Sequence, residues 1–139
     1  MKVVVFEGVV SDVNGLVNLG TIEGKEEYSS LGAMDHPAIN NNNKIQIETV
    51  SRTLDQLVSD NMIEPGFIKI DVEGAENLVL KGAVETLQRN RPIIVSELYD
   101  FLLKRNGTSA QQVISKLESL DYSVIDPFNK GRTPGSLKF

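Results

Sequence analysis

The chain has 139 residues, of which 40% are hydrophobic and 24% charged, so it can bury the core of one domain but not of two. The formal net charge of −5 argues against a general nucleic-acid binder, because phosphate contacts require a surplus of Lys and Arg. Cysteine is absent and no apolar stretch reaches the roughly 20 residues of a membrane span, which excludes disulfides, thiolate chemistry and a membrane partner and indicates a cytoplasmic protein.

The N-terminal part has the pattern of a β-hairpin. Val3–Val10 is a run rich in β-branched apolar residues, which predicts a strand. Asn14 and Gly15 follow, and apolar residues resume over 16–22. Because Asn and Gly both tolerate a positive φ, this pair predicts a tight hairpin turn between the two strands.

The next segments predict a loop, a strand and a short helix. Residues 23–43 are polar and irregular and end in consecutive asparagines, so we expect a long loop. Lys44–Val50 alternates apolar and polar residues, as a half-buried strand does. Ser51 or Thr53 can then cap a helix that ends near Asn61.

The pattern then changes to strand, helix and strand. Phe67–Val72 and Pro92–Leu98 are short apolar strands, and Ala75–Asn90 between them has the apolar stripe of a helix. Such a unit implies two parallel strands joined by a right-handed crossover.

A further helix and a closing strand complete the predicted elements. Thr108 or Ser109 opens the helix, and Tyr122–Ile125 predicts the strand. The core-facing residues predicted for this helix and the one before it are Val79, Leu80, Ala83, Val84, Leu87, Val113, Ile114, Leu117 and Leu120.

The candidate site is an acidic cluster at the end of the first parallel strand. Asp71 and Glu73 follow that strand, and Glu76 stands in the first turn of the next helix, where we expect it to be exposed. In open parallel α/β sheets, ligands bind beyond the carboxyl ends of the strands. Parallel pairing should bring Glu97, at the end of the neighbouring strand, near Asp71. Gly74 allows a sharp turn and a close approach of a ligand to the backbone.

The cluster admits a functional and a structural interpretation. Crowded carboxylates can provide a general base, or can hold a metal, an ammonium group or a hydroxyl. Acidic residues in the first turn of a helix are also stabilised by its dipole and need no function. The functional interpretation is stronger for Asp71 and Glu73 than for Glu76.

Three other polar residues are weaker candidates. Lys69, in mid-strand, is expected to lie at an edge or to pair with Glu97. His36 is the only histidine and has no neighbour at metal-ligand spacing. Ser96 has no histidine near it in the sequence, which argues against a hydrolase triad.

Several of these segments together resemble the signature of the FkbM-type methyltransferases. The similarity runs from about Val3 to about Leu98, and the order and spacing of its parts make it specific. The matching runs are VVSD at 9–12 with Gly15 soon after, TLDQL at 53–57, FIKIDVEGAE at 67–76, VLKGA at 79–83 and RPIIVSE at 91–97.

The resemblance implies a Rossmann-like α/β fold with a β-hairpin insertion. It also implies use of S-adenosylmethionine, usually to methylate a hydroxyl of a sugar or another small molecule. By position, Asp71 and Glu73, with Glu97, would act on the acceptor hydroxyl as catalytic residues. Ser11 and Asp12 match the segment near the adenine of the cofactor, and no metal is implied.

One part of the family's pattern has no counterpart in this sequence. The glycine-rich turn after the first strand and the acidic residue that holds the ribose are both missing. We therefore expect them, with the first two strands, to precede Met1, and we expect weak cofactor binding by this chain alone. Residues 1–128 would form a single partial methyltransferase domain, followed by a loose tail at 129–139. The alternative is a non-catalytic association module that keeps the same half of the fold.

The missing strands also predict how the sheet is completed. In the fold that the sequence resembles, the two missing strands lie between Val3–Val10 and Phe67–Val72. Their absence leaves Phe67–Val72 with an unpaired edge. Either Val3–Val10 moves across to that edge, or a second copy of the chain closes it. Because Asn14 and Gly15 tie the first strand to its hairpin partner, we expect a homo-oligomer.

Overall fold

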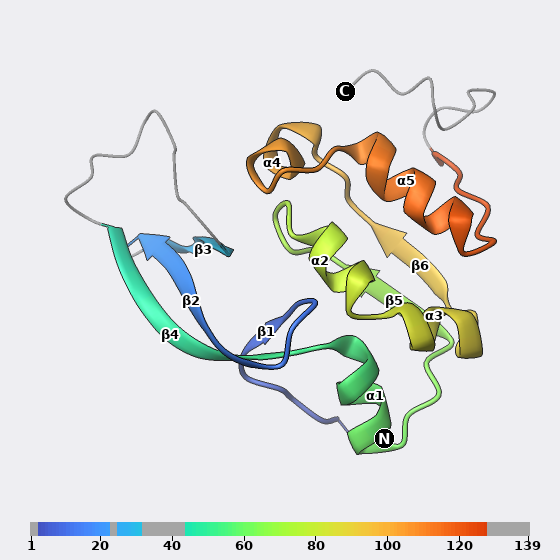
Figure 1. Ribbon diagram of the computed structural model, residues 1–139, viewed down its shortest axis with the longest axis horizontal. Helices are drawn as coiled ribbons and strands as arrows, with labels where there is room; N and C mark the ends of the chain where they lie inside the picture. Colours follow the sequence, from blue (N-terminus) through green and yellow to red (C-terminus); the bar gives the residue numbers. More distant parts are fainter. Residues whose placement is uncertain (1–2, 23–24, 32–43, 128–139) are drawn as a thin grey trace.

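A computed structural model describes residues 3–22, 25–31 and 44–127 of the chain. Over these ranges the protein is a mixed α/β structure with two small sheets and five helices (Figure 1). The strands are β1 (Val9–Val10), β2 (Gly15–Ile22), β3 (Lys25–Leu31), β4 (Lys44–Arg52), β5 (Phe67–Ile70) and β6 (Ile93–Ser96). The helices are α1 (Leu54–Asn61), α2 (Glu76–Lys81), α3 (Val84–Asn90), α4 (Asp100–Arg105) and α5 (Ala110–Ser119).

The four-stranded sheet has the order β1-β4-β2-β3, so β4 lies between β1 and β2. Val9 of β1 and Gly15 of β2 both pair with Ser51, one on each side of β4. The two strands do not pair with each other, and the hairpin predicted at Asn14 and Gly15 is wrong. A hairpin is present in this region, but it joins β2 to β3 in an antiparallel pair.

Contacts at the corner between β1 and β2 explain this difference. The Thr53 backbone N–H donates to Asn14 Oδ1 at 2.9 Å. The Ser51 hydroxyl donates to the carbonyl of Val13, also at 2.9 Å. Both contacts fasten the corner to the junction of β4 and α1. The chain therefore crosses the end of β4 and returns along its other side.

Two further predictions for the N-terminal part need correction. Strand β3 lies inside the segment predicted to be a loop, and its sequence is polar. Among the described strands it pairs with β2 alone, so it forms an edge of the sheet. Of the strand predicted at Val3–Val10, only Val9–Val10 is a strand. It pairs with β4, so it has not moved across to β5. Residues 23–24 and 32–43, which include His36, lie outside the described ranges.

The βαβ unit is confirmed. β5 and β6 form a parallel two-stranded sheet in which Phe67 pairs with Ile93 and Ile70 with Ser96. Both strands are shorter than predicted, because the chain leaves the sheet after Ile70 and after Ser96. The predicted caps of two other helices are also confirmed, because Thr53 accepts from the Gln56 N–H and Ser109 from the Gln112 N–H.

The single helix predicted over Ala75–Asn90 is instead two helices, α2 and α3, separated at Gly82. A β-carbon at Gly82 would lie 2.1 Å from the Ser11 carbonyl oxygen, so only glycine permits this approach. The Gly82 carbonyl accepts from the Asp55 N–H at 2.9 Å. The Asp55 carboxylate in turn accepts from the N–H groups of Glu85 and Thr86, which caps α3 from outside. Contacts with Ser11, which follows β1, and with α1 therefore separate α2 from α3.

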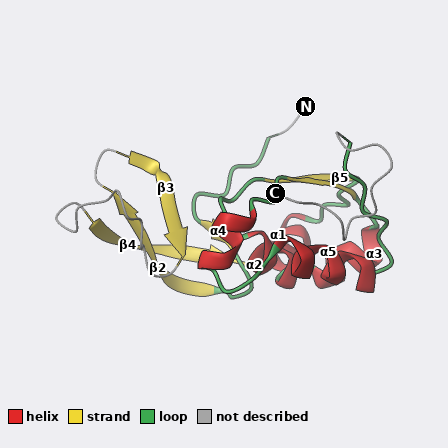
Figure 2. Ribbon diagram, turned by 90° about the horizontal axis from the view of Figure 1, so that it is seen from above, coloured by secondary structure: helices red, strands yellow, loops and turns green. Residues whose placement is uncertain are grey.

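The core lies between one face of the β5–β6 sheet and the helices α2, α3 and α5, which cover that face (Figure 2). The alternating exposure along β5 and β6 leaves Phe67, Ile93 and Val95 exposed on the opposite face. The buried hydrophobic residues include most of those predicted, and they are Ile70, Ala75, Val79, Leu80, Ala83, Leu87, Leu103, Ala110, Val113, Ile114 and Leu117.

The strand predicted at Tyr122–Ile125 is not a strand. The Arg91 guanidinium lies 4.6 Å from the centre of the Tyr122 ring and donates to the carbonyl of Asp121 at 2.6 Å. The Tyr122 hydroxyl donates to the Leu87 carbonyl. These side-chain contacts hold the segment after α5 against α3 without a strand partner in the described chain.

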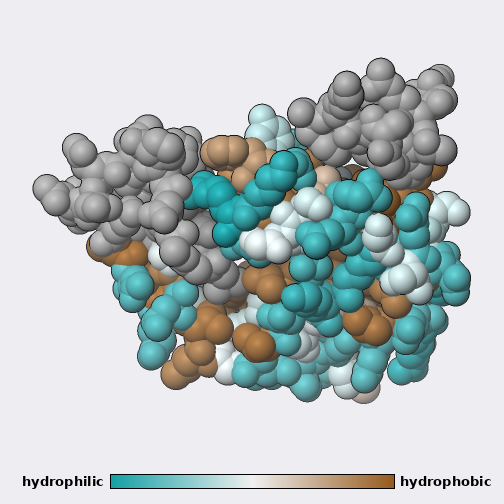
Figure 3. All heavy atoms as spheres, turned by 45° about the horizontal axis from the view of Figure 1, so that its top comes forward, coloured by the Kyte–Doolittle hydropathy of each residue, from teal (hydrophilic) through white to brown (hydrophobic). Residues whose placement is uncertain are grey.

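The surface has no single dominant hydrophobic area on the face shown in Figure 3, where hydrophobic residues lie in separate patches among hydrophilic ones. Within the described ranges, every helix is too short or too polar to cross a membrane.

Candidate functional site

The turn that follows β5 has an unusual backbone. Glu73 adopts a φ of 50° and Gly74 a φ of 99°. A positive φ is uncommon for a residue other than glycine, and it marks a position held by its surroundings. A β-carbon at Gly74 would lie 2.7 Å from the Leu102 carbonyl oxygen. The turn therefore requires glycine at 74 both for its conformation and for the close approach of α4.

Helix α4 holds this turn in place. The Asn106 side chain donates to the Gly74 carbonyl at 3.0 Å, and the Gly74 N–H donates to Glu76 Oε1 at 3.2 Å. Our sequence interpretation missed α4. Its signal was Asp100 four residues ahead of Lys104, a spacing that places an acid and a base side by side on a helix.

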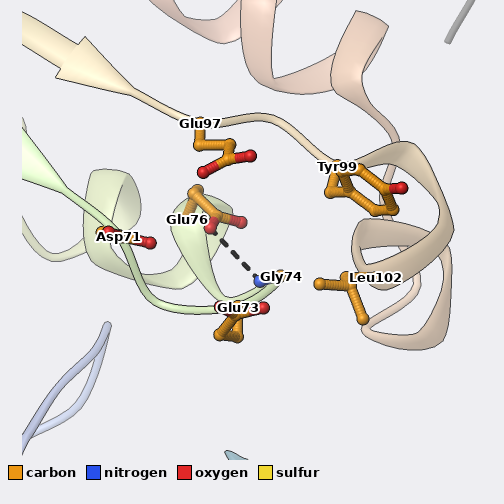
Figure 4. Close-up of a pocket in the computed structure, with 7 residues that line it drawn as sticks. All are labelled: Asp71, Glu73, Gly74, Glu76, Glu97, Tyr99 and Leu102. Carbon is orange, nitrogen blue, oxygen red and sulfur yellow. Dashed lines mark hydrogen bonds between the residues drawn. The ribbon is translucent and has the colours of Figure 1, made fainter. Parts of the chain in front are cut away.

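The acidic residues predicted to meet do line one pocket, of about 180 Å³, at the carboxyl ends of β5 and β6 (Figure 4). Because Ile70 pairs with Ser96, the residues that follow them, Asp71 and Glu97, leave neighbouring strands at the same edge. In Figure 4 the Glu97 side chain extends from the end of β6 toward Glu76. The residues that line the pocket are Asp71, Glu73, Gly74, Glu76, Glu97, Tyr99 and Leu102.

Within the part of the chain that the structure describes, one cation accompanies these carboxylates. Lys69 Nζ lies 2.7 Å from Asp71 Oδ2, so its partner is Asp71 rather than Glu97. The hydrogen bond and charge of Asp71, with a smaller contribution from the charge of Glu97, raise the pKa of Lys69. Both members of the pair are largely exposed, so solvent screens the attraction between them. The pair neutralises Asp71 and leaves the rest of the pocket acidic.

Glu76 is the unexpected member of the site. It was predicted to be exposed, but its side chain is only 2% exposed, because α4 and the turn close over the start of α2. Its Oε2 atom has no hydrogen-bond partner, and neither has the buried Ser96 hydroxyl at the end of β6. These are the two unpartnered buried side-chain oxygens in the described ranges. Leaving such a group unpaired costs about 1–3 kcal/mol, and more if it is charged.

The two residues assigned to the cofactor lie elsewhere. Ser11 is buried, and its hydroxyl lies 2.7 Å from that of Ser51 and accepts from the Val13 N–H. Asp12 is exposed. Neither residue lines the acidic pocket. No group of three acidic, histidine or cysteine residues in the described chain has the arrangement of a metal site.

Comparison with known proteins adds one match. A family model, the methyltransferase FkbM domain, matches residues 8–124, which includes every element from β1 to α5. No curated protein and no solved structure matches the chain.

Proposed function

The chain belongs to the FkbM methyltransferase family, and from this we propose that it transfers a methyl group from S-adenosylmethionine to a hydroxyl of a sugar or another small molecule. The observation that carries the proposal is the pocket at the carboxyl ends of β5 and β6, where carboxylates from two parallel strands meet. This is the ligand-binding edge of an open α/β sheet. The parallel pair with its covering helices also supports a Rossmann-like fold for the domain.

We assign the role of general base to Glu97. It is exposed and has no hydrogen bond or ion pair within the described part of the chain, so it is free to accept a proton. Glu97 takes the proton of the acceptor hydroxyl as that oxygen forms its bond to the methyl carbon. S-adenosylmethionine, when bound, would supply the methyl group from its sulfonium and would leave as the neutral thioether. Asp71, held by Lys69, and Glu73, held in the turn, orient the acceptor.

The cofactor assignment is refined by the contacts of Ser11. Its hydroxyl is committed to Ser51 and Val13, so we propose that Ser11 shapes the corner and that Asp12, exposed beside it, makes the contact. The sequence has no glycine-rich turn after a strand, and we propose that this chain alone binds the cofactor weakly. Calorimetry with S-adenosylmethionine checks this, and a dissociation constant in the low micromolar range would contradict it.

The test of the proposed function is a pair of shape-preserving variants. We expect Glu97→Gln to lower methyl transfer by about 10²–10⁴-fold, the usual contribution of a general base, and Asp71→Asn to lower it less. Glu118→Gln on the exposed surface of α5 is the matched control and should leave transfer unchanged. The assay measures transfer of labelled methyl groups to hydroxyl acceptors at saturating donor. Equal turnover in Glu97→Gln and in the unaltered protein would remove Glu97 from the mechanism.

A second candidate function, a non-catalytic association module, is favoured by a different observation. β5 pairs only with β6, so its other edge is open in the described structure. The sheet face beside that edge exposes Phe67, Ile93 and Val95. We propose that a second copy of the chain occupies this edge, because two strand edges can pair through the backbone whatever their side chains. Light scattering after size exclusion tests it, and a monomer at tens of micromolar would contradict it.

A further inference from the structure

The acidic pocket has an imbalance of charge that methylation of a neutral hydroxyl does not explain. Asp71, Glu73, Glu76 and Glu97 all line it, and Lys69, the one cation beside it in residues 3–22, 25–31 and 44–127, is paired with Asp71. Carboxylates that line one pocket repel one another unless a positive group lies among them. The pocket is therefore suited to a cationic ligand.

Glu76 indicates where the positive group of a ligand would bind. One of its carboxylate oxygens accepts from the Gly74 N–H, and the other has no partner although the side chain is buried. Buried polar groups in proteins are nearly always paired. A carboxylate oxygen accepts hydrogen bonds, so a donor on a ligand would supply the partner that this atom lacks. In Figure 4 the space beside Glu76 is also the space that Glu97 extends into.

The other walls limit the size and kind of that ligand. The pocket volume of about 180 Å³ lies below the roughly 300–1,000 Å³ of sites for drug-sized molecules. A ligand no larger than a single sugar ring suits it. The ring of Tyr99 lines the same space, and an aromatic ring attracts a cation near its face.

We propose that the acceptor carries a protonated primary amine in addition to the hydroxyl that receives the methyl group, and that this ammonium binds between Glu76 and Glu97. The inference rests on the proposed function, since it names the class of acceptor for that site. An ammonium group has three donors, which can serve the unpartnered oxygen of Glu76 and the free carboxylate of Glu97 together. Charge-assisted hydrogen bonds of this kind are the strongest that side chains make.

The same ammonium chemistry has a second possible source, the amino group of the methyl donor's own methionine part. The two sources differ in what surrounds the amine. An acceptor offers sugar-like hydroxyls, whereas the donor offers an α-carboxylate, which the acidic pocket would repel. Repulsion of that carboxylate by Glu73 favours the acceptor.

The test measures binding without cofactor, so it does not depend on methyl transfer. Glucosamine and glucose are titrated separately into the protein at about pH 6.5, where the amine is protonated. Binding is followed by calorimetry or by NMR shifts. L-Methionine is the third probe, for the amine of the donor. We expect glucosamine to bind at least about tenfold more tightly than glucose. We expect Glu76→Gln and Glu97→Gln to abolish that preference and Glu118→Gln to preserve it.

Three results would overturn the proposal. The first is equal binding of glucosamine and glucose. The second is a preference for glucosamine that survives in Glu76→Gln while circular dichroism shows the fold intact. The third is tighter binding of L-methionine than of glucosamine, if Glu76→Gln abolishes that tighter binding. Failure here leaves methyl transfer to neutral hydroxyls possible. Conversely, a clear preference for the amine in a protein that transfers no methyl group would contradict the proposed function and leave the ammonium site standing.

Discussion

The β5–β6 unit and the four-stranded sheet are built in opposite ways. The buried hydrophobic residues of the described chain all lie between Ile70 and Leu117, in and around the β5–β6 unit. The four-stranded sheet and the corner after β1 contribute the buried hydroxyls of Ser51 and Ser11, while Leu16 and Ile47 of the sheet are exposed. The β5–β6 unit is stabilised by the packing of buried side chains, and the four-stranded sheet by backbone hydrogen bonds between its strands. The acidic pocket is attached to the packed region, which can hold the Glu73–Gly74 turn in its strained conformation.

The two regions meet at a small number of defined contacts. The Ser11 carbonyl lies against Gly82, and α1, which follows β4, caps α3 through Asp55. Each contact joins backbone to backbone or carboxylate to backbone, so it depends on exact placement more than on buried area. Substitutions in the packed region, at the contacts and near the pocket should therefore have effects of different size.

The largest effect is expected in the packed core. Leu87 is fully buried, and Leu87→Ala should lower the free energy of unfolding by about 2–5 kcal/mol through lost burial and a new cavity. Leu16→Ala, in the four-stranded sheet, removes the same atoms from a side chain that is 67% exposed. This variant should change the free energy of unfolding by less than about 0.5 kcal/mol. Urea unfolding of both variants measures the difference. Equal losses would show that the two sheets share one core.

A smaller effect is expected where the regions touch. Gly82→Ala places a methyl group against the Ser11 carbonyl, and it should cost about 1–3 kcal/mol because the backbone on both sides must shift. The matched control is Gly66→Ala, where an added β-carbon meets nothing within 4 Å, and this change should be neutral or slightly stabilising. Urea unfolding again measures both. A tolerated Gly82→Ala would mean that the two regions are not held against each other.

The Asp55 cap should contribute somewhat less. Asp55→Ala removes the acceptor for the Glu85 and Thr86 N–H groups and should cost about 1–2 kcal/mol, as a lost N-cap does. Asp60→Ala, near the other end of α1, removes an exposed ion pair with Arg52 and a hydrogen bond from the Gln56 side chain. This change should cost less than about 0.5 kcal/mol. Thermal unfolding distinguishes the two. If Asp60→Ala proved the more costly, the cap assigned to Asp55 would be wrong.

The smallest effect is a pH dependence beside the pocket. The hydrogen bond from Lys104, and then that from the Ala110 N–H, lower the pKa of Asp100, which joins α4 to α5. Because the folded pKa is the lower one, the stabilisation is present above the unfolded pKa of about 3.9 and is lost as the pH falls through the folded value. We expect the difference in unfolding free energy between the protein and Asp100→Asn to shrink below about pH 4. Urea unfolding over a pH series measures it, and a constant difference would exclude this contribution.

Local sequence determined the elements and one half of the site. The apolar runs at 67–72 and 92–98 and the stripe between them were sufficient to predict two parallel strands. That pairing in turn placed Asp71 and Glu97 at one edge. The Thr53 and Ser109 caps were also predictable, because a cap is a contact between residues three apart in the chain.

Tertiary structure decided what each element meets, and this changed the site. Glu76 is buried because α4 closes over the turn, and the predicted long helix breaks because Gly82 lies against Ser11. β1 pairs with β4 instead of β2 because Asn14 and Ser51 fasten the corner to the start of α1. Propensity, periodicity and capping act over a few residues, so a sequence pattern expresses them directly. These contacts join residues 30 or more positions apart, and their choice depends on packing over the whole chain.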